Sequence, residues 1–165
     1  MLSGIDSVSA TVPSQEPINL VSPGPKTFSV IAKDKAGNQR DISVTYKVIY
    51  NFSDILSPIE SDGTSVFKLG GTIPIKFQLK DAQGNFITNA VVRLNMQKFS
   101  NDEPSGEPIE AVSTAFSTTG NLFRYDASED QYIFNFSTKA LSTGLWQLKI
   151  ELDDGERYSV FIGLK

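Results

Sequence analysis

The fold of this chain is decided by the stretch Gly70-Gly71-Thr72-Ile73-Pro74-Ile75-Lys76-Phe77-Gln78-Leu79. Its large apolar residues stand at every second position after the glycines, and polar residues or proline stand between them. In an extended chain, alternate side chains point to opposite faces. The stretch therefore predicts a strand with one face in a core and the other face toward solvent.

Within this strand, Pro74 and Lys76 share the face opposite Phe77. Proline has no N–H group to donate to a neighbouring strand, which indicates an edge strand or a bulge. Proline and lysine at an edge also hinder the addition of a foreign strand. We interpret Pro74 and Lys76 as edge protection and Phe77 as core. An alternative for Lys76 is an isopeptide crosslink to an Asn or Asp, which requires a buried acid beside it.

Alternation of this kind recurs along most of the chain, and no segment has a sustained helical period. The turn sequence Lys-Asp-x-x-Gly-Asn occurs at 33–38 and again at 80–85. Short strands between Gly-, Asp- and Asn-rich turns predict an all-β, immunoglobulin-like β-sandwich. We also expect a short strand at 17–21, a polar loop at 100–108 and a strand at 109–116. The predicted scaffold residues are Phe28, Val30, Val44, Tyr46, Ile73, Ile75, Phe77, Leu94, Phe134, Trp146, Leu148, Val160 and Ile162.

A connector between the two halves of the chain holds Pro58 and Asp62-Gly63 and lacks a sustained period. We place the domain boundary at its start, which gives a first unit at 1–50 and a second at 51–165. The first unit offers about four strands, fewer than the roughly seven of a closed immunoglobulin sandwich. It is therefore predicted to be a partial domain.

Composition excludes several classes of function. The net charge is −4 and the basic residues are scattered, whereas nucleic-acid binding needs a concentrated basic surface. The chain has no Cys and no His, which excludes thiolate or imidazole zinc sites, Cys nucleophiles and Ser-His-Asp triads. No apolar run reaches membrane-spanning length. The first residues lack the features of a signal peptide, so we expect a secreted form to belong to a longer chain.

Acidic side chains gather in several turns, and the best candidate for a calcium site is formed by Asp126, Glu129 and Asp130. Calcium takes clustered oxygen ligands. The alternative, which we favour for each turn, is that Asp and Asn bind the backbone of their own turn. We predict no catalytic residues and, apart from this calcium site, no cofactor.

Aromatic residues suggest a second candidate site, because aromatic faces stack on sugars. Trp146 and Tyr132 fall in register with apolar neighbours, so we assign them to the core. Tyr125 and Phe123, on either side of Arg124, are the candidates for a carbohydrate-binding platform.

Several motifs carry a resemblance to known families. Ser3-Gly4-Ile5, the run from Lys26 to Asn38 and the strand from Ser43 to Val48 resemble the second half of a bacterial immunoglobulin-like repeat, whose front strands are absent here. From Tyr50 onward the chain resembles the PxKF domain, through Pro74-Ile75-Lys76-Phe77, Gly70-Gly71-Thr72-Ile73 and Trp146-Gln147-Leu148. Members of that family often carry cysteines in this half. This chain has none, so no disulfide is carried over.

The PxKF resemblance implies an accessory domain of a large secreted or surface-bound bacterial or archaeal protein. We therefore expect a non-catalytic extracellular module, a spacer, terminal cap or adhesion element, whose partner is the rest of a larger polypeptide. One alternative is a carbohydrate-binding module attached to a secreted hydrolase, with cell-surface polysaccharide as its partner. Another is a self-assembling surface or filament subunit that uses an open sheet edge.

Overall fold

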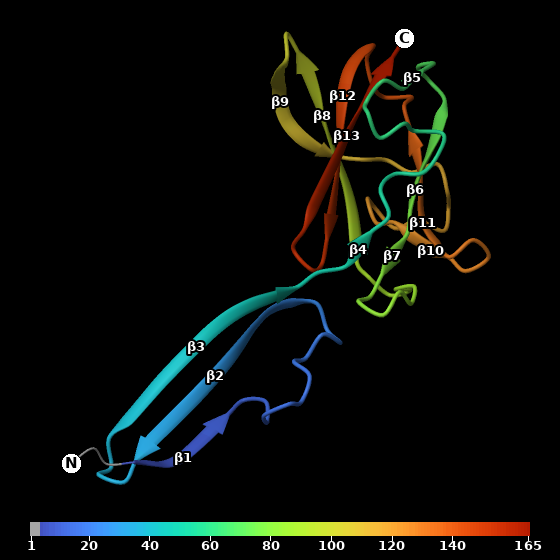
Figure 1. Cartoon of the computed structure of the whole chain (residues 1–165). Coiled ribbons are helices and arrows are strands. Elements are labelled where there is room, and N and C mark those ends of the chain that lie inside the picture. The colour runs from blue at the N-terminus through green and yellow to red at the C-terminus, as the bar shows by residue number, and fades with distance from the viewer. Residues whose placement is uncertain (1–3) are drawn as a thin grey trace. The chain divides into compact units, whose positions relative to one another are not determined.

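The computed structural model describes residues 4–165 and divides the chain into two compact units, 1–49 and 50–165 (Figure 1). The sequence predicts the boundary one residue later, after Tyr50. The regular elements of both units are strands, so the predicted all-β fold class is confirmed. Within the described residues there is no helix long and apolar enough to cross a membrane.

Unit 1 is a single antiparallel sheet with two different faces. Its strands follow the order β1 (Ile5–Ala10), β2 (Gly24–Asp34) and β3 (Gln39–Val48). On one face Phe28 lies opposite Val44, and on the other Ser29 shares a 2.8 Å hydrogen bond between hydroxyl groups with Ser43. The period-two alternation of β2 and β3 therefore produces an apolar face and a polar face, as their sequences predict.

The apolar face of unit 1 has no second layer in the structure. No residue from 4 to 49 is buried, and the side chains of Ile42 and Val44 are 56% and 58% exposed. The prediction that Phe28, Val30, Val44 and Tyr46 are core residues is therefore wrong for this unit. A sheet can bury its apolar face only against another element. In unit 1 the loop between β1 and β2 lies against part of this face, since the Tyr46 hydroxyl donates to the Asn19 carbonyl at 3.2 Å and Ile18 lines a hollow together with Phe28. This loop leaves every described residue of the unit at least partly exposed.

Unit 2 contains two main sheets and a short strand pair. The larger sheet has the order β5 (Val66–Phe67), β13 (Arg157–Leu164), β12 (Gly144–Leu152), β8 (Val92–Ser100) and β9 (Glu103–Glu110). The smaller has the order β10 (Arg124–Asp126), β11 (Gln131–Ser137) and β6 (Thr72–Phe77). The pair is β4 (Asn51–Phe52) with β7 (Leu79–Lys80). Within these sheets β5 and β13 pair in parallel, and the other strand pairs are antiparallel.

The two main sheets of unit 2 enclose one apolar core. Ile75 and Phe77 of β6 are 0% exposed, and they join Leu148 of β12 and Ile162 of β13 in one cluster of buried side chains. The predicted scaffold residues of this unit are confirmed as buried. They are Ile73, Ile75, Phe77, Leu94, Phe134, Trp146, Leu148, Val160 and Ile162.

Strand β6 is the outer strand of its sheet, and Pro74 lies where its missing N–H group costs least. The backbone N–H of Leu56 donates to the Lys76 carbonyl (2.8 Å) on the side away from β11. Alternate residues of a strand direct their backbone groups to the same side, so the Pro74 nitrogen also faces away from β11. The strand neighbours of Lys76 are Leu56 and Ile133, and neither is the acid that a crosslink requires.

Three predicted elements are wrong in whole or in part. Residues 17–21 form no strand, because the Asn19 side chain accepts from the Val21 N–H (3.0 Å) in a local turn. The predicted loop at 100–108 instead contains most of β9, which pairs with β8. Asn101 and Asp102 form the connecting turn with positive φ angles of 53° and 64°, a conformation that suits Asn and Asp in tight hairpins. The predicted strand at 109–116 accordingly ends at Glu110.

Candidate binding face of the five-stranded sheet

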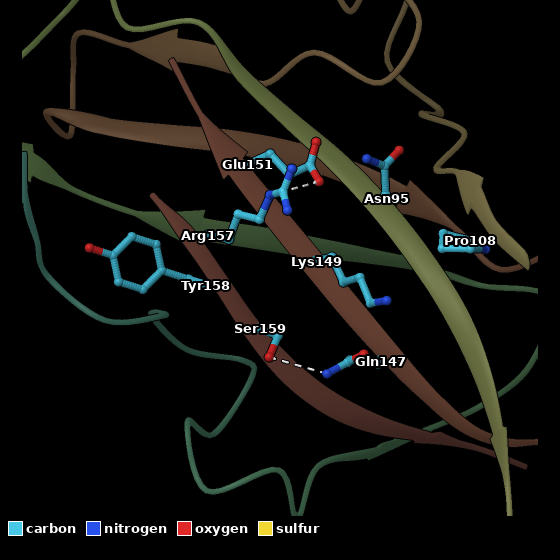
Figure 2. A pocket seen from close by; sticks show the side chains of 8 residues that line it. All are labelled: Asn95, Pro108, Gln147, Lys149, Glu151, Arg157, Tyr158 and Ser159. Atoms are coloured by element: carbon cyan, nitrogen blue, oxygen red, sulfur yellow. Dashed lines mark hydrogen bonds and ion pairs between the residues drawn. The ribbon is translucent and has the colours of Figure 1, made fainter. Parts of the chain in front are cut away.

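Polar side chains cover much of the outer face of the five-stranded sheet. They occupy the positions that alternate with core residues, and the antiparallel register lines them up across three strands. A hollow of about 400 Å³ lies on this face, and Figure 2 shows the side chains that line it. Its lining residues are Asn95, Pro108, Gln147, Lys149, Glu151, Arg157, Tyr158 and Ser159. We call this the polar hollow.

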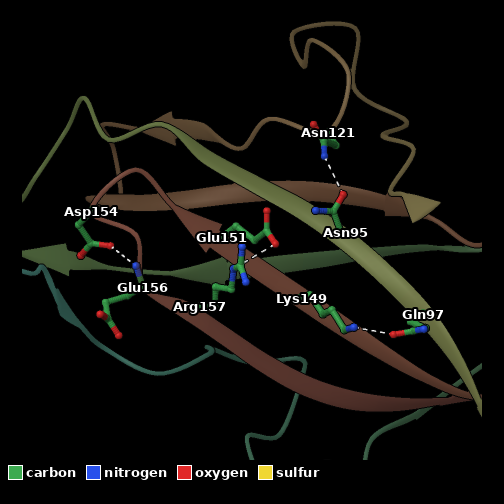
Figure 3. Close-up of polar contacts among 8 residues, drawn as sticks. All are labelled: Asn95, Gln97, Asn121, Lys149, Glu151, Asp154, Glu156 and Arg157. Carbon is green, nitrogen blue, oxygen red and sulfur yellow. Dashed lines mark hydrogen bonds and ion pairs between the residues drawn. The ribbon is translucent and has the colours of Figure 1, made fainter. Parts of the chain in front are cut away.

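Lys149 is held in place by a buried amide on the neighbouring strand β8. Its ammonium donates to Gln97 Oε1 (Figure 3). Gln97 Nε2 in turn donates to the Gly106 carbonyl at 2.7 Å. Gln97 is only 7% exposed, and these two hydrogen bonds satisfy both the oxygen and the nitrogen of its amide within the protein. The position of the Lys149 charge is therefore fixed by a group that cannot easily move.

A second buried amide orients Asn95. Asn121, which is 3% exposed, donates from Nδ2 to Asn95 Oδ1 (3.1 Å), and its own oxygen accepts from Arg93 at 3.5 Å. Because the Asn95 oxygen is used in this way, its Nδ2 group is left for the polar hollow. Within the described residues, no hydrogen bond is made by this Nδ2 group.

The remaining polar contacts of the hollow are weak. Arg157 Nε lies 3.4 Å from Glu151 Oε1, with the arginine side chain 79% exposed, and Gln147 Nε2 donates to Ser159 Oγ at 3.3 Å. Exposed ion pairs of this kind contribute about 0–1 kcal/mol to stability. These side chains therefore do little for the fold and remain available to a ligand.

An aromatic hollow lies on the same sheet face, next to the polar one. It is lined by Asp62, Gly63, Phe99, Asp102, Leu145 and Phe161 and has a volume of about 380 Å³. The rings of Phe99 and Phe161 meet edge to face, with centroids 4.9 Å apart and planes at 85°. Phe161 lies opposite Gln147, which lines the polar hollow. The two hollows are therefore neighbours along β12 and β13.

Two of the three predicted calcium residues, Asp126 and Asp130, accept hydrogen bonds from side chains or backbone of their own hairpin. Asp126 Oδ1 accepts from the Ser128 N–H (3.1 Å) and hydroxyl (2.7 Å), and these bonds lower the pKa of Asp126. Asp130 accepts from the Tyr125 hydroxyl at 2.7 Å, a bond that raises the pKa of Tyr125. Across residues 4–165, no group of three or more His, Cys, Asp or Glu side chains is placed to hold a metal ion. Calcium binding by Asp126, Glu129 and Asp130 stays a prediction.

The predicted carbohydrate platform is split between core and surface. Phe123 is 8% exposed and packs against Phe77 with ring centroids 5.0 Å apart, so it offers little ring area to a ligand. Tyr125 is half-buried and meets Tyr132 edge to face. The sequence analysis missed Phe99 and Phe161. A signal was present, because the alternation that buries Val160 and Ile162 turns Phe161 outward.

No family model and no curated protein matches the chain, and the PxKF resemblance stays a prediction. Among solved structures, the chain is similar to domains 4 and 5 of the S-layer protein SbsC (18% identity, TM-score 0.38, 86% of this chain and 58% of that one). A structure of surface layer protein SbsC domains 4–9 gives 16% identity and a TM-score of 0.39, over 86% of this chain and 18% of that one. SGBP-B of the Bacteroides ovatus mixed-linkage glucan utilization locus, in complex with a mixed-linkage heptasaccharide, gives 14% identity and a TM-score of 0.33, over 99% of this chain and 37% of that one. The chain spans less than two thirds of each, and at these values the likeness extends to no activity, ligand or site.

Proposed function

We propose that this chain is a non-catalytic structural module of a larger secreted or cell-surface protein, where it serves as a spacer, terminal cap or adhesion element. The observation that carries the proposal is the open apolar face of unit 1. Such a face can pack against the β-structure of a neighbouring domain.

The two faces of unit 1 differ in a way that favours one covered side. Val8, Ile42 and Val44 are 56–59% exposed on the apolar face, whereas Ser29 and Ser43 bind each other on the polar face. Full burial of one Val or Ile side chain contributes about 1.5–3 kcal/mol. A second β layer with its own apolar face would therefore stabilise unit 1 substantially, and the rest of a larger polypeptide is the partner we propose for it.

The use of the acidic side chains supports the non-catalytic part of the proposal. Asp81 accepts from the backbone of Gln83 and Asn85, and Asp62 accepts from the backbone and hydroxyl of Thr64. The pKa of Asp81 is lowered by a hydrogen bond from the Asn85 side chain (2.9 Å) together with these backbone bonds, and the pKa of Asp62 is lowered by its bonds from Thr64. Acid–base catalysis by paired carboxylates needs one pKa raised, the opposite direction.

The absence of cysteine from the chain allows a direct test by thiol labelling. Val44→Cys places a thiol on the apolar face of β3, and Thr45→Cys places one on the polar face next to it. In the protein's native setting, we expect alkylation of the first variant to be at least tenfold slower than that of the second. Equal rates would show that nothing covers the apolar face and would contradict the proposal.

A second candidate function is self-assembly, favoured by the same open face and by the outer edges of β1 and β3. In that case the purified chain associates with increasing concentration. Val44→Asp abolishes the association, whereas Thr45→Asp preserves it. Sedimentation velocity measures both. A monomer at all concentrations would count against self-assembly and would leave the larger polypeptide as the covering partner.

A further inference from the structure

We propose that the outer face of the five-stranded sheet binds a neutral oligosaccharide chain. The polar hollow would hydrogen-bond sugar hydroxyl groups, and the Phe99–Phe161 pair of the aromatic hollow would pack against the apolar face of a neighbouring sugar ring. This inference is independent of the structural role proposed for unit 1, because it uses only residues of unit 2.

The polar hollow contains both donors and acceptors that no residue of the hollow uses. A sugar hydroxyl both donates and accepts, so its site needs groups of both kinds. Asn95 offers its Nδ2 hydrogens, Lys149 offers the ammonium hydrogens that Gln97 does not take, and Gln147 offers its Oε1. Figure 2 shows these three side chains lining the same hollow.

The side chains of this face are held in place before any ligand binds. Gln97 and Asn121 are almost fully buried, and each binds a residue that lines the hollow, Lys149 and Asn95 respectively. Binding then costs less side-chain entropy, because the contacting groups are already immobilised.

The aromatic pair Phe99 and Phe161 lies next to the polar hollow. Phe99 and Phe161 are only half-buried, although they lie on the water-facing side of the sheet. Aromatic faces combine large apolar area with a negative quadrupole, which suits the C–H groups of a sugar ring. The distance along β12 from Leu145 to Glu151 is about 20 Å at the usual rise per residue. The two hollows together therefore match a chain of several sugars rather than one.

Charge favours a neutral ligand. Lys149 and Arg157 bring two positive groups to the hollows, while Glu151, Asp62 and Asp102 bring three negative ones. Arg157 and Glu151 also partly neutralise each other. A polyanion would meet the carboxylates and a polycation the basic groups, so neither is favoured over an uncharged polysaccharide.

The test is affinity electrophoresis of the full chain in native gels that contain a soluble polysaccharide. The neutral probes are hydroxyethyl cellulose, mixed-linkage β-glucan, galactomannan and dextran, and the acidic probe is alginate. We expect retardation by at least one neutral polysaccharide. No retardation by any neutral polysaccharide, or retardation by alginate alone, would overturn the proposal.

A matched pair of double variants locates the site. Gln147→Leu with Arg157→Leu removes donors from the polar hollow, and neither side chain supports a buried group. Gln78→Leu with Arg124→Leu makes the same chemical change outside this face, directly after β6 and in β10 respectively. We expect the apparent Kd to rise at least fivefold for the first pair and to stay unchanged for the second. Equal effects of the two pairs would contradict binding at this face.

The aromatic part of the site has its own readout. Phe161→Leu removes the ring but keeps an apolar side chain next to Gly63. A Cβ atom placed on Gly63 would lie 3.4 Å from the Phe161 Cβ, so the two residues are close neighbours. We expect a threefold or greater loss of affinity together with an unchanged thermal unfolding temperature. Retained affinity would show that the ring does not contact the sugar and would overturn this part of the proposal.

Discussion

Units 1 and 2 are built from the same local sequence patterns, but only unit 2 forms a buried core. Both contain alternating strands, and both contain the Lys-Asp-x-x-Gly-Asn turn with nearly the same hydrogen bonds. Asp34 accepts from the Asn38 N–H at 2.9 Å, and Asp81 accepts from the Asn85 N–H at 2.8 Å. Yet unit 2 buries an apolar core between two sheets, whereas no described residue of unit 1 is buried.

The difference shows what alternation specifies. A period of two fixes which side chains share a face, and turn chemistry fixes where a hairpin closes. Neither determines whether a second layer is present to cover the apolar face. In unit 2 that layer comes from strands far along the same chain, such as β12 against β6. In unit 1 the described residues provide only the loop between β1 and β2, which leaves the face partly exposed.

The largest expected effect comes from separating the units. We expect residues 50–165 to fold alone, with a melting temperature within a few degrees of that of the full chain, because their core is complete. Residues 1–49 alone should show no cooperative unfolding, since a sheet with an open apolar face cannot offset the entropy of ordering its chain. Circular dichroism melts of both fragments measure this. A cooperative transition in 1–49 would remove the need for a covering layer.

Truncation of one matched phenylalanine in each unit sharpens the comparison. Phe134 in β11 is 0% exposed, so Phe134→Ala should lower the free energy of unfolding by about 3–5 kcal/mol. Phe28 holds the equivalent apolar position in unit 1 but is only half-buried. Phe28→Ala should therefore cost less than about 1 kcal/mol in the purified chain. Urea denaturation gives both values, and a cost for Phe28→Ala close to that for Phe134→Ala would mean that unit 1 is closed in solution.

The sequence predicted unit 2 well for a physical reason. Period-two alternation around Ile75, Phe134 and Leu148 requires a buried face, and the chain supplied both layers. It failed at β9, where pairing with β8 outweighs a polar sequence and the Asn101–Asp102 turn was overlooked. The candidate site was missed almost entirely. The polar hollow depends on which residues share a row across β8, β12 and β13, and register between distant strands cannot be read from one strand alone.

A smaller effect is expected at the first residue of unit 2. Asp154 is 3% exposed, and one carboxylate oxygen accepts from the backbone N–H of Glu156 at 2.8 Å (Figure 3). The other accepts from the backbone N–H of Tyr50, also at 2.8 Å. Asp154→Ala leaves both donors without this partner and should cost about 1–3 kcal/mol. Asp41→Ala, at an exposed position in unit 1, is the control and should have almost no effect. An equally small effect at Asp154 would show that water replaces it freely.

The smallest expected effect concerns the repeated turn, and it depends on pH. Hydrogen bonds from the Asn85 side chain and backbone lower the pKa of Asp81 below its ordinary value of 3.8. A lowered folded-state pKa gives a stabilising contribution that is fully present above pH 3.8 and is lost as the pH falls through the folded-state value. Asp81→Ala should therefore lower the melting temperature slightly at neutral pH and have no effect well below pH 3.8.

Asp34→Ala makes the same change in unit 1, where the hairpin lies outside any buried core. We expect it to speed amide exchange at residues 34–38 without moving the main unfolding transition, because opening this hairpin exposes no buried apolar surface. Thermal melts combined with hydrogen exchange separate the two outcomes. If Asp34→Ala shifts the main transition as much as Asp81→Ala does, the two units unfold as one cooperative body, and the contrast between an open sheet and a closed sandwich does not hold in solution.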